Sequence, residues 1–93
     1  MATILRADGA RVELLGTRAD GTLTLLQLQT AVGGSIDIVR LRRDGKTMVV
    51  HDEGVILGLP VNVEGTRLYR ANTLPNDFSI HGDVVLAEPW EVT

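Results

Sequence analysis

Turn signals centred on glycine recur along the chain and divide it into short apolar segments. Asp-Gly pairs stand at Asp8-Gly9, Asp20-Gly21 and Asp44-Gly45, and glycine also follows or precedes acids at 52–54 and 81–83. Asp-Gly favours tight hairpin turns, because glycine adopts the positive φ that such turns require at no steric cost. Short apolar segments joined by these turns predict a mostly antiparallel sheet.

The segments between the turns are expected to be strands, since they alternate apolar and polar residues or are continuously apolar. The predicted strands cover residues 3–6, 11–15, 36–42, 47–51, 55–57, 78–80 and 84–87. Pro60 lacks a backbone N–H, so residues 58–62 are not expected to form a central strand. Residues 63–76 are expected to form a long loop that carries Arg67 and Arg70.

One segment, residues 22–32, is expected to be helical. It begins with strand-like alternation, but its apolar residues then recur at the spacing of a helix face. Those residues are Leu25, Leu28 and Val32. Thr22 can serve as the N-cap, and Gly33-Gly34 supplies the left-handed residue that ends many helices. The expected fold class is therefore α+β, a mostly antiparallel sheet with one helix packed on a face.

The composition is that of a globular protein. The chain has 93 residues, of which 44% are hydrophobic and 23% charged, so we expect residues 1–93 to form a single domain. Cysteine is absent, which excludes disulfides, thiolate catalysis, iron–sulfur clusters and cysteine-based zinc sites.

The charge and hydropathy patterns bear on partners and location. The formal net charge is −3, whereas binding to a nucleic-acid backbone requires clustered Lys and Arg, so nucleic acid is not an expected partner. No apolar run approaches the roughly 18–20 residues that cross a bilayer, and the N-terminal residues lack the pattern of a signal peptide. We therefore expect a cytoplasmic protein with no membrane partner.

Three motifs occur in order along most of the chain. They are Leu28-Gln29-x-x-Val32-Gly33-Gly34-x-Ile36-x-x-Val39, Asp52-Glu53-Gly54-x-x-x-Gly58-Leu59-Pro60-x-Asn62 and Ile80-x-Gly82-Asp83. From about Leu28 onward the chain resembles a small phage and prophage family called domain of unknown function 3846. Two departures stand out: the family usually has Asn where this chain has His51, and often a basic residue where it has Val55. The resemblance implies a viral or prophage origin and an accessory role, and it implies no catalytic residues.

The segment from Gly58 to Asn62 is the best candidate for a ligand-binding site. Gly58 permits close approach to the backbone, Pro60 stiffens the loop, and Asn62 offers both a donor and an acceptor. Arg67 or Arg70 beside it would supply positive charge for a phosphate. The alternative is a strand-ending turn in which the Asn62 amide satisfies local backbone groups, and the sequence leaves both interpretations open.

Other polar groups are weaker candidates. A metal site would need the turns at His51-x-Glu53 and His81-x-Asp83 to meet, and neither has the spacing of a known metal signature. Arg40, Arg42 and Arg43 could join a phosphate site or simply form a solvated strand end. Neither Ser35 nor Ser79 stands in the Gly-x-Ser-x-Gly pattern of a nucleophile elbow. We therefore expect no catalytic residues, no metal and no cofactor.

The leading functional hypothesis is a non-enzymatic phage or prophage accessory protein in the host cytoplasm. A sharper version is counter-defence by sequestering a small anionic, nucleotide-like ligand. The alternative is a protein-interaction module that inhibits or redirects a host protein through edge-strand pairing or an apolar patch such as Trp90. A homo-oligomer is expected in either case, because contact with another copy would bury unpaired edge strands and apolar segments such as 55–57 and 84–86.

Overall fold

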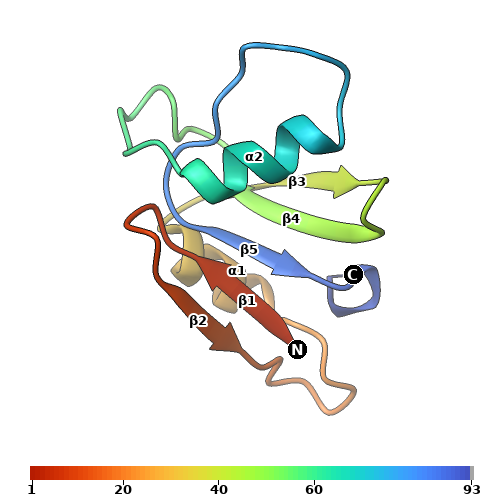
Figure 1. The fold of residues 1–93 in the computed structure, drawn as a ribbon. Helices are drawn as coiled ribbons and strands as arrows, with labels where there is room; N and C mark the ends of the chain where they lie inside the picture. Colours follow the sequence, from red (N-terminus) through yellow and green to blue (C-terminus); the bar gives the residue numbers. More distant parts are fainter. Residues whose placement is uncertain (93) are drawn as a thin grey trace.

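The structure is a computed structural model, and it describes residues 1–92 (Figure 1). In chain order the elements are β1 (Ala2–Leu5), β2 (Arg11–Leu14), α1 (Leu25–Val32), β3 (Ile36–Leu41), β4 (Lys46–His51), α2 (Val63–Ala71), β5 (Val84–Ala87) and the 3-10 helix η1 (Pro89–Glu91). The five strands form one sheet with the order β2-β1-β5-β4-β3. Every neighbouring pair is antiparallel. The α+β class and the antiparallel sheet predicted from the turn signals are confirmed.

Strand β5 lies at the centre of the sheet, although it is the last strand along the chain (Figure 1). It joins two hairpins: Val85 is paired with Ile4 of β1 on one side and with Val49 of β4 on the other. Val49 and Val85 are completely buried. Of the residues 84–86 expected to need cover, Val84 and Val85 are thus core and Leu86 is half-buried, so this strand is covered within the chain. β2 and β3 remain as the edge strands.

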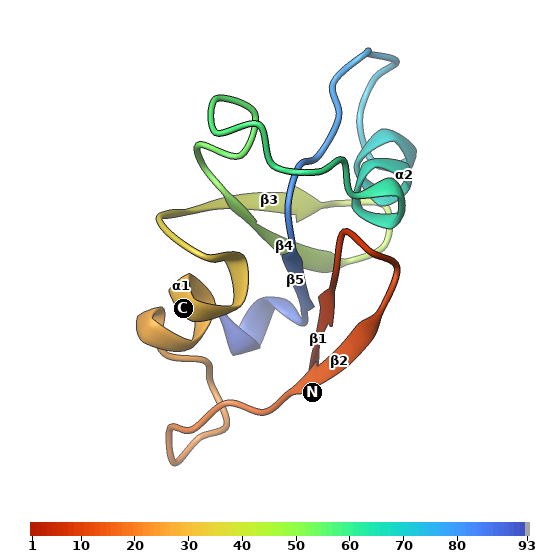
Figure 2. The ribbon, with the colours of Figure 1, turned by 90° about the vertical axis from the view of Figure 1, so that its left-hand side faces the viewer.

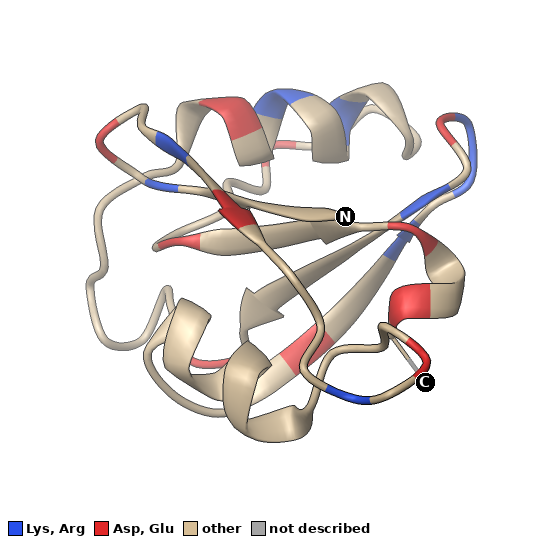
Figure 3. Ribbon diagram, turned by 90° about the horizontal axis from the view of Figure 1, so that it is seen from below, with Lys and Arg blue, Asp and Glu red and all other residues tan. Residues whose placement is uncertain are grey.

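The two helices cover opposite faces of the sheet (Figures 2 and 3). Leu28 and Val32 of α1 pack in one apolar cluster, together with Ile4, Val49 and Val85. Leu68 and Tyr69 of α2 pack against a second cluster on the other face, built around Leu5, Leu41, Met48 and Val84. The sheet therefore has a helix on each face, whereas the sequence predicted one helix on one face.

Helix α1 begins later than predicted. Its N-cap is Thr24, whose hydroxyl oxygen accepts from Gln27 N at 3.0 Å while the Gln27 side chain accepts from Thr24 N at 3.1 Å. Thr22, the predicted cap, is instead bonded to Asp20. The capping box requires Gln three residues after the cap, and only Thr24 has it. Gly33, with φ 86°, ends the helix as predicted.

Helix α2 replaces most of the predicted loop 63–76. Asn62 is its N-cap and accepts from Gly65 N at 2.8 Å. Glu64 stands in the first turn and Arg70 in the last, where each complements the helix dipole. The segment is polar on average and includes a glycine, so the helix depends on its cap at Asn62 and on packing against the sheet.

Two predicted strands are wrong. Residues 55–57 lie in a series of turns closed by Leu57 N to Glu53 O at 2.9 Å and Leu59 N to Gly54 O at 3.0 Å. Residues 78–80 are irregular, and only the single bridge between Val61 and His81 follows them. Residues 55–57 are apolar and residues 78–80 alternate, but neither segment has a neighbouring strand to pair with. None of the helices within residues 1–92 is long and apolar enough to span a membrane.

Candidate functional site

An open groove lies between α2 and the chain segments at Val61 and Ser79, and we refer to it as the α2 groove. Its volume is about 490 Å³. It is lined by Val61, Val63, Thr66, Arg67, Arg70 and Ser79. The four helical residues recur at the spacing of one helix face. Val61 and Ser79 come from the two chain segments that are joined by the bridge between Val61 and His81. The groove thus combines two guanidinium groups with apolar side chains.

The segment that carries Ser79 forms the wall opposite α2, and backbone hydrogen bonds of Ile80 attach it to the helix. Ile80 N donates to the Thr66 hydroxyl oxygen at 2.9 Å, and Ile80 O accepts from Asn62 N at 2.7 Å. Thr66 is 8% exposed, so these bonds are shielded from water. The two contacts fix the segment that carries Ser79 against the first turn and a half of α2.

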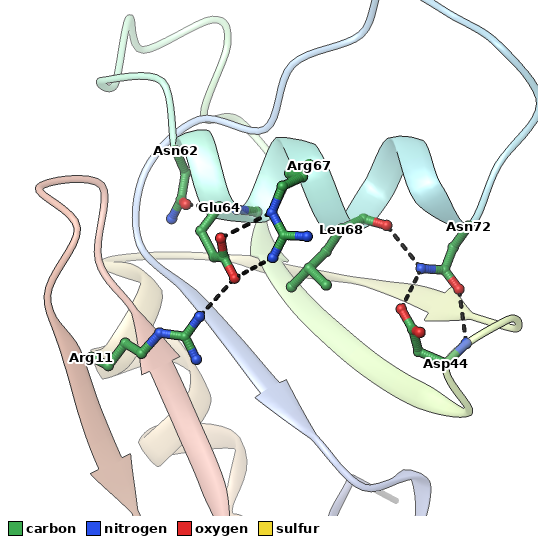
Figure 4. A network of polar contacts seen from close by, with 8 residues as sticks. Arg11, Asp44, Asn62, Glu64, Arg67, Leu68 and Asn72 are labelled. Atoms are coloured by element: carbon green, nitrogen blue, oxygen red, sulfur yellow. Dashed lines mark hydrogen bonds and ion pairs between the residues drawn. The ribbon is translucent and has the colours of Figure 1, made fainter.

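Arg67 is ion-paired within the protein (Figure 4). Its guanidinium holds the Glu64 carboxylate through two contacts, Nη2 to Oε1 at 2.7 Å and Nε to Oε2 at 3.2 Å. Arg11 of β2 reaches the same carboxylate, with Nη2 2.7 Å from Oε1. The hydrogen bond from Arg67 lowers the pKa of the Glu64 carboxyl, the charges of Arg67 and Arg11 lower it further, and Glu64 in turn raises the pKa of Arg67.

Arg70 differs from Arg67 because its contact is with a neutral group. Its Nε donates to the Phe78 carbonyl oxygen at 3.2 Å. Within residues 1–92 it forms no ion pair with a carboxylate. The bond to Phe78 uses Nε and leaves the Nη atoms of this groove residue for a ligand. Arg70 is therefore the residue of the groove best suited to hold an anion.

Asn62 has a structural position. It is fully buried, its Nδ2 donates to Leu5 O at 2.8 Å and to Gly82 O at 2.9 Å, and its Oδ1 accepts from Gly65 N. These bonds use both donors of the amide and one acceptor site. The geometry corresponds to the second interpretation of this residue, satisfaction of local backbone groups, and the amide presents no free edge to a ligand.

The structure brings together only part of the predicted ligand site. Arg67 and Arg70 share the α2 groove, although they do so from a helix and not from a loop. Gly58 and Pro60 are exposed on the preceding loop and do not line the groove. Contact between a ligand and Gly58 or Pro60 stays a prediction. The other lining residues, Val61, Val63, Thr66 and Ser79, were not predicted from the sequence. For the helix that carries Val63 and Thr66, the available signal was Asn62 as a cap followed by Glu64 in the first turn.

Both histidine rings contact backbone groups: His51 ends β4, and His81 forms the bridge with Val61. Glu53 N donates to His51 Nδ1 at 3.0 Å, and His81 Nδ1 lies 2.8 Å from the Leu59 carbonyl oxygen. The Asp83 carboxylate accepts from Ala7 N at 2.9 Å. In the part of the chain that is described, no three His, Asp or Glu side chains gather in a way that could hold a metal ion.

The arginines at the end of β3 are exposed, and the turn that follows them docks on α2. Asp44 N donates to Asn72 Oδ1 at 3.0 Å, and Asn72 Nδ2 donates to Asp44 Oδ2 at 2.8 Å (Figure 4). Arg40, Arg42 and Arg43 take part in none of the ion pairs found in residues 1–92. They do not line the α2 groove.

Comparison with known families covers nearly the whole chain, because one family model matches residues 3–91. The chain belongs to the family described as a domain of unknown function (DUF3846). No curated protein and no solved structure is similar enough to count as a match. For this DUF3846 domain, functional inference therefore rests on the groove and its charges.

The Glu64 ion pairs predict a pH dependence. Glu64 has a pKa below its ordinary value of 4.5, so its charged form stabilises the folded state. That contribution is complete above pH 4.5 and is lost as the pH falls through the lowered pKa. An NMR titration of the Glu64 side-chain carboxyl carbon should give a midpoint below 4.5. Arg67→Gln should raise the midpoint and Arg42→Gln should leave it unchanged, whereas a wild-type midpoint at or above 4.5 would contradict the assignment.

Proposed function

We propose that this protein binds a small anionic ligand in the α2 groove and sequesters it without chemical conversion. The observation that carries the proposal is Arg70, a guanidinium on the groove that no carboxylate within residues 1–92 neutralises. A planar fork of N–H donors matches a phosphate or carboxylate, and such charge-assisted bonds are about twice as strong as neutral ones.

The groove also indicates what kind of anion would fit. Its volume of about 490 Å³ falls among small-molecule sites, which commonly range over ~300–1,000 Å³. Val61 and Val63 offer apolar surface, while Ser79 contributes a hydroxyl. One available cationic group beside apolar walls favours a ligand with a phosphate and a flat apolar part. A nucleotide-like molecule has this chemistry.

The second hollow near α2 is a weaker candidate. It has a volume of about 250 Å³ and is lined in part by Arg6 and Arg11. Both arginines already face carboxylates: Arg6 lies 3.6 Å from Asp83 and Arg11 lies 2.7 Å from Glu64. An anion there would compete with these internal partners, whereas at Arg70 it would not.

The biological setting is part of the same proposal. Resemblance to phage and prophage proteins supports an accessory role in the host cytoplasm, and ligand sequestration is a form of counter-defence that needs no catalytic residues. The alternative is a protein-interaction module, favoured by the exposed loop residues Val55, Ile56 and Leu57, which are 68%, 82% and 58% exposed. Three adjacent apolar side chains at this level of exposure are typical of a protein-binding surface.

Removing the Arg70 guanidinium should weaken ligand binding at least tenfold. A charge-assisted hydrogen bond contributes about 1.5–3 kcal/mol, which corresponds to roughly ten- to hundredfold in affinity. Isothermal titration calorimetry with adenosine 5′-monophosphate and with inorganic phosphate would compare wild type with Arg70→Ala. Arg43→Ala is the matched control, since it removes the same charge from an exposed position outside the groove.

The outcomes separate the two functions. Loss in Arg70→Ala with retention in Arg43→Ala supports the groove, while equal loss in both would mean nonspecific attraction and contradict it. If wild type binds neither anion and Ile56→Asp alone abolishes biological activity, the interaction module is favoured. The melting temperature of each variant should match wild type, because Arg70, Arg43 and Ile56 are exposed.

A further inference from the structure

Strand β2 is an edge strand whose residues face solvent. Arg11, Val12 and Glu13 are exposed, and only Leu14 is half-buried. β2 pairs on one side with β1, and its other side carries no strand in the described chain (Figure 2). We infer that two copies of this protein pair antiparallel through β2, with Arg11 of each copy opposite Glu13 of the other.

The backbone of β2 fixes which residues can bond to a second copy. Arg6 N donates to Ala10 O at 2.9 Å, so these two residues form a hydrogen-bonded pair of the β1–β2 hairpin. Bonded and non-bonded pairs alternate along an antiparallel ladder. Val12 opposite Ile4 is therefore a bonded pair, while Arg11 opposite Leu5 and Glu13 opposite Thr3 are not. The N–H and C=O groups of Arg11 and Glu13 thus point away from β1.

Symmetry then restricts the register. A two-fold axis perpendicular to the sheet keeps α1 on the same side in both copies, so facing residues must come from the same face of β2. Placing Arg11 opposite Glu13 of the partner subunit meets this condition, and it centres Val12 on Val12 of the partner subunit. Shifting the partner strand by two residues in one direction would place Glu13 opposite Glu13 of the partner subunit, and in the other direction Arg11 opposite Arg11 of the partner subunit. Like charges directly opposite each other destabilise a strand pair, so charge selects the first register.

The other edge strand lacks this complementarity. Asp52 N donates to Ser35 O at 3.1 Å, so by the same alternation Ile36, Ile38 and Arg40 have their backbone groups directed outward from β3. In the corresponding two-fold registers these residues face one another, and within the bounds of β3 Asp37 faces Val39, Leu41 or its own copy. No such register sets opposite charges against each other, so β2 is the edge that fits a second copy.

The apolar face of β2, which carries Val12, also favours pairing with a second copy. Val12 is 39% exposed, and beside it an apolar hollow of about 300 Å³ lies between β2 and α1. Ile4, Leu14, Leu26, Gln27, Thr30 and Ala31 line this hollow. Leu26 is 72% exposed at its rim, and a second β2 laid alongside would cover part of this surface. Gln27 Nε2 already donates to Leu15 O at 2.7 Å, so the new ladder would end at Glu13.

The dimer would reach the α2 groove through Arg11. This residue already donates through Nη2 to Glu64, which also holds Arg67 (Figure 4). A guanidinium has five N–H donors, so Arg11 can bond Glu13 of the partner subunit without releasing Glu64. Pairing through β2 would then connect the two copies of the Arg67–Glu64–Arg11 network across the new interface.

Charge reversal at β2 tests the inference. Light scattering on the full chain at 1–100 µM should give twice the 10.0 kDa chain mass for wild type at the upper concentrations. Glu13→Arg replaces two opposite-charge pairs with two like-charge pairs, and it should weaken the dimer about tenfold or more. Arg11→Glu should do the same. Mixing the two variants should restore association, since each then meets an oppositely charged strand.

Asp37→Arg on β3 is the matched control, because it makes the same charge change on the other edge and should leave the dimer intact. Glu13 forms no ion pair within residues 1–92, so Glu13→Arg removes no internal contact of this kind. If Arg11→Glu fails to fold, Glu13→Arg is sufficient to test the dimer. A wild-type monomer at 100 µM, a dimer unchanged by Glu13→Arg, or a mixture of folded variants that stays monomeric would overturn the inference.

Discussion

Replacing Asn62 by alanine is expected to lower the free energy of unfolding by about 3–5 kcal/mol. Its side-chain amide forms hydrogen bonds with three backbone groups: Leu5 O at the end of β1, Gly82 O before β5, and Gly65 N in the first turn of α2. Asn62 is completely buried, so water cannot replace these partners. Each buried group left unpaired costs about 1–3 kcal/mol, and the N-cap contribution is lost with them.

The other end of the same helix provides a matched control. The Asn72 side-chain amide also makes three hydrogen bonds, with Asp44 N, Asp44 Oδ2 and Leu68 O (Figure 4). It is only half-buried, so water can reach the groups that Asn72→Ala would leave. We expect a loss below about 1.5 kcal/mol for Asn72→Ala. Urea denaturation of both variants would compare the two losses, and equal losses would mean that burial of Asn62 does not decide its effect.

Replacing Gly16 by alanine is expected to cost about 3 kcal/mol, although Gly16 has no positive φ. A Cβ there would lie 2.1 Å from Gly21 O and 2.4 Å from Thr22 O. Both are backbone atoms, so no change of rotamer relieves the contact. The loop must open, and this would displace the adjacent Leu23, which is 2% exposed and whose N–H donates to Glu91 O at 2.8 Å.

Gly33→Ala separates steric contact from backbone conformation. Gly33 has φ 86°, but an added Cβ would have nothing within 4 Å. Its cost should be that of the left-handed conformation, about 1 kcal/mol. Thermal and urea unfolding of the two variants should therefore place Gly16→Ala clearly below Gly33→Ala in stability. If Gly33→Ala proved the more damaging change, the close approach around Gly16 would not constrain the loop.

The features predicted correctly from the sequence depend on local chemistry. The turns at Asp8-Gly9 and Asp44-Gly45 and the end of α1 at Gly33 each need only a few adjacent residues. The start of α1 was placed two residues early because Thr22 and Thr24 are both plausible caps. Gln27 decides between them, since its side chain completes the capping box with Thr24 alone.

The errors arose where distant contacts decide the structure. Residues 55–57 have strong strand propensity, but a strand needs a partner, and in the fold none lies beside them. Helix α2 contains Gly65 and is polar on average, and it depends on the buried cap at Asn62. Arg67 and Arg70 were expected near a ligand because they follow the 58–62 turn in sequence, whereas Ser79 reaches the groove because its neighbour Ile80 donates through N to the Thr66 hydroxyl oxygen.

The central position of β5 has a consequence for how the chain assembles. During synthesis both hairpins leave the ribosome before the strand that joins them, so neither can complete the sheet when it first forms. Until residues 84–87 arrive, the inner edges of β1 and β4 lack the partner that they have in the native order. Pairings between residues so far apart in sequence form slowly, and unpaired edges promote aggregation in the interval. Folding of this small protein should therefore be limited by capture of its last strand and not by formation of its turns.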